Sequence, residues 1–171
     1  MSNHEQWVDS VLPSHNRLTE SVVTILQNLL KSNNINYLSV NGRTKNKKSI
    51  LEKIERKNYQ SPQDELTDLS GIRVIVYFES DIKKVSNIIE SSFKVDKKNS
   101  LNQDEKLSTN QLGYRSIHYV CDIGENRECL PEFNGLKDLK FEFQVRTVLQ
   151  HAWAELAHDS NYKFTDKLPS D

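Results

Sequence analysis

The sequence predicts an α+β protein in which a mixed sheet of about five strands packs against helices, with an α/β sandwich left open as the alternative. Segments with apolar residues at every second position alternate along the chain with segments of helical spacing. The 171 residues, 36% of them hydrophobic, are enough for one domain with its own core. Without an internal repeat or a Pro/Gly/Ser-rich linker, a single domain over residues 1–171 is expected.

The most regular strand pattern lies in Asp64–Phe78, DELTDLSGIRVIVYF. Alternation predicts an apolar face with Ile72, Val74, Val76 and Phe78, and a mixed face with Arg73, Ile75 and Tyr77. Asp68 precedes the strand, and Gly71 lets the backbone turn into it. A carboxylate at a strand entrance is a candidate metal ligand, and an Asp that accepts hydrogen bonds from turn amides is the alternative.

Helical spacing and turn signals place the other elements around this strand. Helices are expected over residues 15–32 and 46–57, after a cap at Ser80 or Asp81, and from a cap at Thr147 to about Asn161. Strands are expected over residues 37–40, 93–95, 114–121 and 139–146. The polar segment 97–111 should be a long loop, either a binding loop or lid or a disordered segment.

The strand at 139–146 has one apolar and one polar face. Its apolar face carries Leu139, Phe141, Phe143 and Val145, and its polar face carries Lys140, Glu142, Gln144 and Arg146. A polar sheet face is often only a solvated one. In the neighbouring strand, however, alternation puts Tyr114, Ser116 and His118 in one row. An aromatic ring, a hydroxyl and an imidazole in a row indicate a binding surface.

A third group of residues is basic. The segment GRTKNKKSILEK holds Arg43, Lys45, Lys47, Lys48 and Lys53 where a loop enters a helix. Cations beside the free N–H groups of a helix N-terminus suit a polyphosphate, although charge runs are commonly solvated faces. Together with the two carboxylates, this group could hold a nucleotide–magnesium complex beside an acceptor hydroxyl.

These segments, in this order, resemble the RelA/SpoT-type alarmone synthetases, which transfer pyrophosphate from ATP to the ribose 3′-hydroxyl of GDP or GTP. GRTKNKKSILEK resembles the family's ATP-phosphate motif, DLSGIRVIVYF its magnesium-Asp strand, GYRSIHY its nucleotide-stacking motif and EFQVRT its catalytic-Glu motif. HAWAELAHDSNYK resembles its closing helix. The resemblance covers most of residues 40–163 and implies a nucleotidyltransferase-like synthetase fold.

The resemblance also implies roles for single residues. Arg43, Lys45 and Lys53 would contact ATP phosphates, Asp68 and Glu142 would be the catalytic pair and bind Mg²⁺, Tyr114 would stack on the acceptor base, and His118, Gln144 and Arg146 would support the acceptor pocket. The sequence departs from the family at Asn110 and Leu112, where housekeeping members carry Lys and Asn. This difference leaves other acceptors open: the 3′ end of tRNA, as in toxin members, or an adenine nucleotide.

Composition limits the remaining classes. The net charge of −1 argues against bulk binding of nucleic acid, and no apolar run approaches a membrane span of about 20 residues. With no secretion signal, a cytoplasmic protein is expected, and Cys121 and Cys129 should be reduced thiols.

His158-Asp159 lacks the further ligands of an HD hydrolase, so no such domain is expected. Trp153, with Val148, Leu149 and Leu156, is expected in the core.

The function hypothesis is a magnesium-dependent GTP pyrophosphokinase that uses ATP and GDP or GTP. A catalytically silent domain that senses a nucleotide or a protein partner is the alternative from another class. Relatives usually continue beyond the closing helix, so the chain is also expected to be a fragment truncated at its C-terminus. A homo-oligomer or an antitoxin partner is left open.

Overall fold

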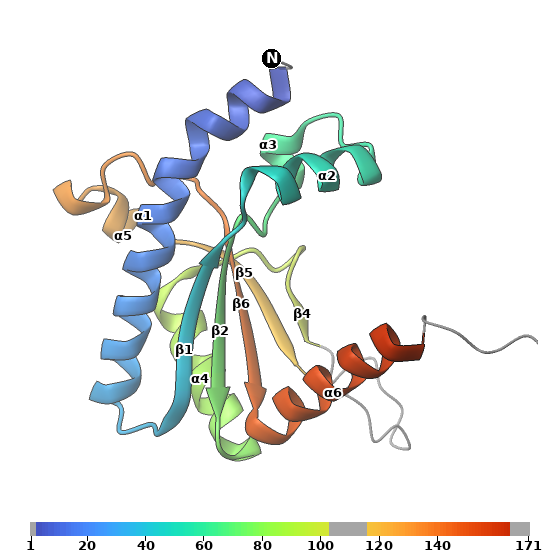
Figure 1. The fold of residues 1–171 in the computed structure, drawn as a ribbon. Coiled ribbons are helices and arrows are strands. Elements are labelled where there is room, and N and C mark those ends of the chain that lie inside the picture. The colour runs from blue at the N-terminus through green and yellow to red at the C-terminus, as the bar shows by residue number, and fades with distance from the viewer. Residues whose placement is uncertain (1–2, 103–115, 165–171) are drawn as a thin grey trace, which may run out of the picture.

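The computed structural model describes residues 3–102 and 116–164. In chain order the elements are α1 Asn3–Ser32, β1 Tyr37–Thr44, α2 Lys47–Lys57, α3 Pro62–Glu65, β2 Ser70–Val76, α4 Glu79–Ser92, β3 Lys94–Val95, β4 Leu101–Asn102, β5 Ile117–Asp122, α5 Glu125–Glu128, the 3-10 helix η2 Pro131–Phe133, β6 Phe141–Thr147 and α6 Val148–Phe164. The prediction of an α+β fold with a mixed sheet is confirmed (Figure 1).

The sheet has the order β1-β2-β6-β5-β3, and β4 pairs with β5 outside this path. The central strands β2 and β6 are parallel, whereas every other pair is antiparallel. In the parallel register Gly71 lies beside Glu142 and Arg73 beside Gln144. The antiparallel register places His118 beside Gln144. Three polar positions that are remote in sequence therefore become neighbours on one face of the sheet.

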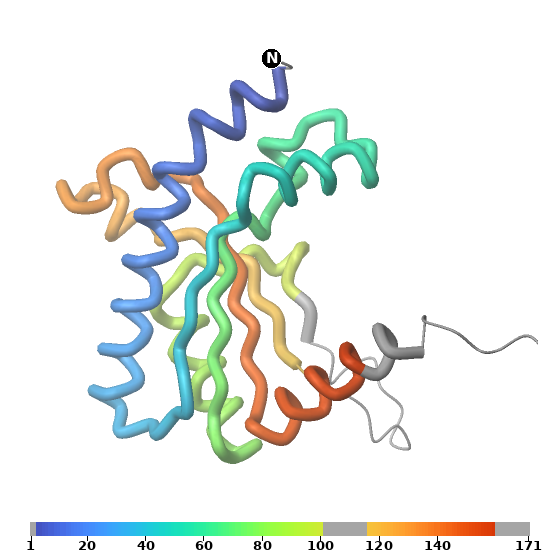
Figure 2. Tube along the Cα trace, viewed as in Figure 1, coloured from blue at the N-terminus to red at the C-terminus, as the bar shows by residue number. Residues whose placement is uncertain are grey.

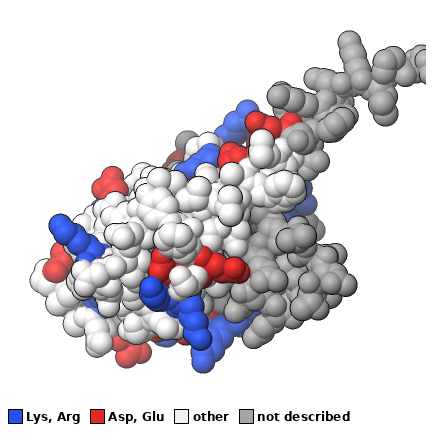
Figure 3. Space-filling view, turned by 90° about the horizontal axis from the view of Figure 1, so that it is seen from below, with Lys and Arg blue, Asp and Glu red and all other residues white. Residues whose placement is uncertain are grey.

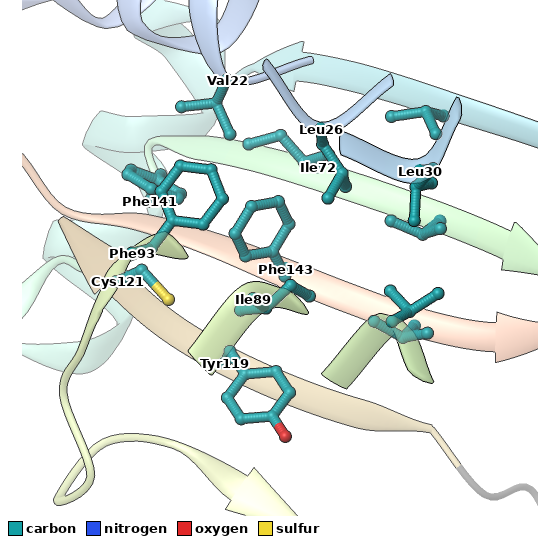
Figure 4. Packing of buried hydrophobic residues seen from close by; sticks show 14 of the residues in the cluster. Val22, Leu26, Leu30, Ile72, Ile89, Phe93, Tyr119, Cys121, Phe141 and Phe143 are labelled. Atoms are coloured by element: carbon teal, nitrogen blue, oxygen red, sulfur yellow. The ribbon is translucent and has the colours of Figure 1, made fainter. Parts of the chain in front are cut away.

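The opposite face of the sheet is the core, and α1 and α4 cover it. Phe141, Phe143 and Val145 are fully buried there, as predicted. The rings of Phe141 and Phe143 meet edge to face with centroids 5.3 Å apart, and Phe93 packs against both (Figure 4). Because this cluster occupies one face, the alternate side chains of β2, β5 and β6 are directed to the other face.

A second apolar cluster holds α2 and the segment before β2. Ile50 and Ile54 of α2 are buried as predicted, and they pack with Val8 of α1. Leu66 and Leu69 belong to the same cluster, and they flank Asp68 in the sequence. Asp68 is therefore attached to a buried segment and not to a free loop.

Helix α1 lies alongside β1, as Figure 2 shows. The approach is closest at Gly42, where an added Cβ would stand 2.6 Å from methyl carbons of Thr19 and Val23. The Asn41-Gly42 pair is a common turn signal, yet here β1 continues through it to Thr44, four residues beyond the expected strand end. This glycine provides space for a helix.

Several predicted details are wrong. Helix α1 begins at Asn3 and contains Pro13, where a start near residue 15 was expected. Phe78 is 69% exposed and is the cap residue of α4, because β2 ends at Val76 and α4 begins at Glu79. The short elements α3, α5 and η2 were not expected. Within the predicted loop 97–111, β4 pairs with β5, and residues 103–111 lie outside the described part of the chain.

The predicted core stripe of α6 is also wrong. Leu149, Trp153 and Leu156 are 80%, 60% and 61% exposed, and Val148 is half-buried. The start of the helix is as predicted: the Thr147 hydroxyl accepts from the Gln150 N–H at 3.2 Å, and the Gln150 side chain accepts from the Thr147 N–H at 2.8 Å. This reciprocal capping box fixes where α6 leaves the sheet.

The surface carries charges of both signs. On the face in Figure 3, Lys/Arg groups alternate with Asp/Glu groups among the described residues, and they form no continuous basic band there. None of the described helices is both long and apolar enough to cross a membrane.

Both cysteines are free, as predicted: Cys121 is buried, and burial raises the pKa of its thiol to about 12, whereas Cys129 is exposed.

Candidate functional site

A cavity of about 520 Å³ lies over the polar face of the sheet. The elements β1, β2, β5, β6, α2 and α6 and the segment before β2 all contribute to its wall. Its polar lining consists of Asn41, Arg43, Lys45, Ser49, Asp68, Arg73, His118, Glu142, Gln144 and His151. Segments that are up to about a hundred residues apart in sequence thus converge here, as the strand order requires.

One end of the cavity holds a carboxylate between two lysines. Asp68 Oδ2 accepts from Lys53 Nζ at 2.8 Å and also forms an ion pair with Lys45. Burial alone raises the pKa of Asp68, but the hydrogen bonds from the two lysines outweigh it and hold that pKa below its usual range. Burial lowers the pKa of Lys53, yet the hydrogen bond and charge of Asp68 raise it overall. The group keeps a net positive charge.

A chain of hydrogen bonds crosses the middle of the cavity and ends at Glu142. Arg73 Nε donates to Gln144 Oε1 at 3.0 Å, which turns the amide nitrogen of Gln144 toward His118 Nε2, 3.3 Å away. An amide nitrogen can only donate, so Nε2 accepts and the ring proton lies on Nδ1. That proton is donated to Glu142 Oε1, 3.3 Å away. Ser116 Oγ lies 2.9 Å from His118 Nε2 and helps to hold the imidazole ring in this orientation.

The far end of the cavity adjoins α6. Arg146 Nη1 donates to His151 Nδ1 at 3.3 Å, which leaves the ring proton of neutral His151 on Nε2. Burial and then the positive charge of Arg146 lower the pKa of His151. Arg146, which was predicted to support the acceptor pocket, is only 3% exposed. It does not line the cavity but contacts His151, which does.

Most of the predicted site residues meet in this cavity. Arg43, Lys45, Asp68, His118, Glu142 and Gln144 line it, and Lys53 reaches it through Asp68. Tyr114 lies outside the described residues, as do Asn110 and Leu112. Sequence reasoning missed Arg73 and His151. Arg73 could have been suspected because alternation already placed it on the same face as the site.

Magnesium fits the carboxylates of this site. Asp68 Oδ1 is buried and makes no hydrogen bond to any described residue, so this oxygen has its lone pairs available. Within residues 3–102 and 116–164, no three His, Cys, Asp or Glu residues form a closed metal site. Magnesium does not need one, because it is commonly held by one or two carboxylates together with phosphate oxygens and water. Asp68 is the residue that would hold it, whereas Glu142, the other predicted ligand, already accepts a hydrogen bond from His118.

Comparisons with known proteins agree with this architecture. The family model described as "Region found in RelA / SpoT proteins" matches residues 42–167. The chain is 32% identical to GTP pyrophosphokinase YjbM of Bacillus subtilis (strain 168) over 133 residues, which are 76% of this chain and 59% of that protein. The chain thus spans about six tenths of the length of this curated relative.

Two solved structures extend the comparison. A GTP pyrophosphokinase family protein from Streptococcus pneumoniae aligns with a TM-score of 0.74 at 26% identity, covering 99% of this chain and 82% of that one. Small alarmone synthetase 1 from Bacillus subtilis, bound to its product pppGpp, aligns with a TM-score of 0.70 at 25% identity, covering 96% and 84%.

Proposed function

The chain belongs to the RelA/SpoT family, and from this premise we propose that it is a GTP pyrophosphokinase that transfers pyrophosphate from ATP to the 3′-hydroxyl of GDP or GTP. One observation carries the proposal: a cavity on the polar face of the sheet combines a lysine-rich end with a carboxylate that hydrogen bonds hold in place. Such a cavity can bind a polyphosphate at one end and take up a proton near it.

The lysine-rich end would bind the phosphates of ATP. Lys45 and Lys53 now share one carboxylate, so incoming phosphate oxygens offer both ammonium groups additional negative charge. Arg43, on the cavity wall beside them, adds a cation with a fork geometry that suits phosphate. As the lysines turn to the phosphates, Asp68 regains oxygen lone pairs. Magnesium, when bound there, would neutralise charge that develops on the transferring group.

Glu142 would act as the general base. The acceptor 3′-oxygen attacks the β-phosphorus of ATP, the bond between that phosphorus and the α,β-bridging oxygen breaks, and AMP leaves. The proton of the 3′-hydroxyl passes to the Glu142 carboxylate, which the His118 N–H orients. The other residues hold the two substrates in line, which supplies most of the rate in phosphoryl transfer.

GDP or GTP is the proposed acceptor because the curated relative is itself named a GTP pyrophosphokinase. A tRNA 3′ end is supported less well. The basic helix α2 would have to supply a surface for RNA, but Lys47 pairs with Asp9 at 2.8 Å and Lys48 lies 3.9 Å from Glu52. These ion pairs already offset part of the charge that counterion release would use.

Competition between acceptors tests the proposal. Labelled ATP is offered with Mg²⁺ and GDP, GTP, ADP or total tRNA, and label transfer and AMP are measured by chromatography. We expect labelled guanine nucleotide and acceptor-dependent AMP. Exclusive labelling of tRNA or of ADP would contradict the acceptor assignment. Absence of AMP with every acceptor would favour the silent, nucleotide-sensing domain.

A further inference from the structure

A buried polar network lies beneath the lysine-rich end of the cavity. His15 of α1 is 4% exposed, and its Nδ1 lies 2.8 Å from Oγ of Ser70, the fully buried first residue of β2. The Ser70 hydroxyl donates in turn to the His15 carbonyl at 3.2 Å, so Nδ1 carries the ring proton. Burial lowers the pKa of His15 to about 4, and the ring is neutral at pH 7.

Two threonines extend the network to β1. Thr19 Oγ1 donates to the His15 carbonyl at 2.9 Å and lies 2.8 Å from Thr44 Oγ1. Thr44 and Ser70 form the last pair of the β1–β2 ladder. The network therefore joins the end of β1 and the start of β2 to a helix of 30 residues.

The ends of these two strands lead directly to cavity residues. Lys45 follows Thr44, and its backbone N–H donates to the Leu69 carbonyl at 2.9 Å. Asp68 comes two residues before Ser70 and forms an ion pair with Lys45. The ends of a strand ladder are where local opening starts, so an unsupported ladder end would let Lys45 and Asp68 move apart.

We propose that His15 is a positioning residue, which fixes Lys45 and Asp68 by holding the Thr44–Ser70 end of the β1–β2 ladder against α1. This role for the phosphate-binding end rests on the proposed function, whereas the effect on the ladder end does not. An apolar side chain at position 15 would leave the Ser70 hydroxyl without its nitrogen partner inside the protein. The resulting loss of stability would affect the backbone segments that carry Lys45 and Asp68.

Three variants separate positioning from general stability. His15→Leu removes the Nδ1 donor, whereas His15→Asn keeps an amide nitrogen the same number of bonds from the backbone. Leu18→Ala is the matched control, because Leu18 is a fully buried residue of the same helix and forms no part of the polar network. Each protein is measured for melting temperature, exchange of the Lys45 amide by NMR, and affinity for the ATP analogue AMPCPP with Mg²⁺.

For His15→Leu we expect Lys45 amide exchange, corrected for global unfolding, to be about tenfold faster, and AMPCPP affinity to be about tenfold weaker. His15→Asn should recover most of both values. Leu18→Ala should lower the melting temperature but keep corrected exchange and affinity within about twofold of wild type. The three variants together therefore separate support of the ladder end from loss of stability.

Two results would overturn the inference: unchanged Lys45 exchange in His15→Leu, or equal changes in Leu18→Ala. Failure of wild type to bind AMPCPP or to release AMP would instead count against the proposed function. In that case, the exchange measurement still decides whether His15 holds the ladder end.

Discussion

Asp68 and Glu142 both line the cavity, but Asp68 is paired with two lysine cations, whereas Glu142 receives its hydrogen bond from an imidazole that accepts at its other nitrogen. A carboxylate between two cations has its charge balanced and its proton affinity lowered. Glu142 instead accepts a hydrogen bond from His118, which Gln144 contacts on its other side. Under the proposed function, Asp68 would bind metal beside the phosphate-binding lysines, and Glu142, which lies beside Gly71 in the β2–β6 register, would accept the proton nearby.

The largest effect should follow from changing Glu142, the proposed proton acceptor. Glu142→Gln keeps the size of the side chain but removes its charge, so turnover should fall by about 10² or more while AMPCPP affinity stays within about twofold. Glu52→Gln is the control, because Glu52 is a 64% exposed carboxylate that lies 3.9 Å from Lys48 and does not line the cavity. Near-normal turnover in Glu142→Gln would remove Glu142 from the chemistry.

Changing the other carboxylate should also lower turnover, by about 10², but with a different binding signature. Asp68→Asn releases Lys45 and Lys53, so AMPCPP should bind a few-fold more tightly without Mg²⁺ and gain less from added Mg²⁺ than wild type does. Calorimetry with and without EDTA measures both changes. Asp9→Asn, which removes an exposed ion pair with Lys47, should change neither. An unchanged Mg²⁺ dependence in Asp68→Asn would break the comparison.

Acid should loosen the Asp68 end before it affects Asp68 itself. His15 has a pKa lowered from 6.5 to about 4, so the unfolded chain binds the proton more readily and stability falls as pH decreases through this window. The free energy of unfolding should drop by about 2 kcal/mol from pH 7 to pH 5, measured by urea denaturation. The lowered pKa of Asp68 acts only at still lower pH. His15→Asn should flatten the profile, and an equally steep profile in that variant would place the titration elsewhere.

A smaller effect should follow from loosening the side chain of Glu142. His118→Ala removes the donor to Glu142, so kcat should fall about tenfold while KM for ATP remains nearly constant. His118→Asn should recover part of kcat. His158→Ala, at a mostly exposed site on α6, is the control. A rise in KM for ATP with unchanged kcat would show that His118 binds substrate and does not orient the base.

The smallest effect should come from the exposed stripe of α6. Trp153 does not line the cavity, and its 60% exposed side chain contributes little to the core. Trp153→Ser should therefore have little effect. The free energy of unfolding should change by no more than about 0.5 kcal/mol, as thermal and urea denaturation can establish. A loss of several kcal/mol would contradict the exposed position of Trp153.

Local periodicity was sufficient to predict which side chains lie on each face of the strands. The order of the segments that form the site could also be predicted from the sequence. Phe141, Phe143 and Val145 are buried and Glu142 and Gln144 line the cavity because alternation is a property of the strand backbone itself. The same reasoning placed Lys45 and Asp68 at the ends of elements. It did not pair them, because pairing depends on strand order and register.

Only the tertiary structure decided which residues meet and what covers each face. His15 and Ser70 are 55 residues apart and Arg73 and Gln144 are 71 apart, so no local pattern links them. The stripe of Leu149, Trp153 and Leu156 has ordinary helical spacing, yet all three residues are exposed. Spacing determines which side chains share a face of a helix, whereas burial requires a second surface that packs on that face.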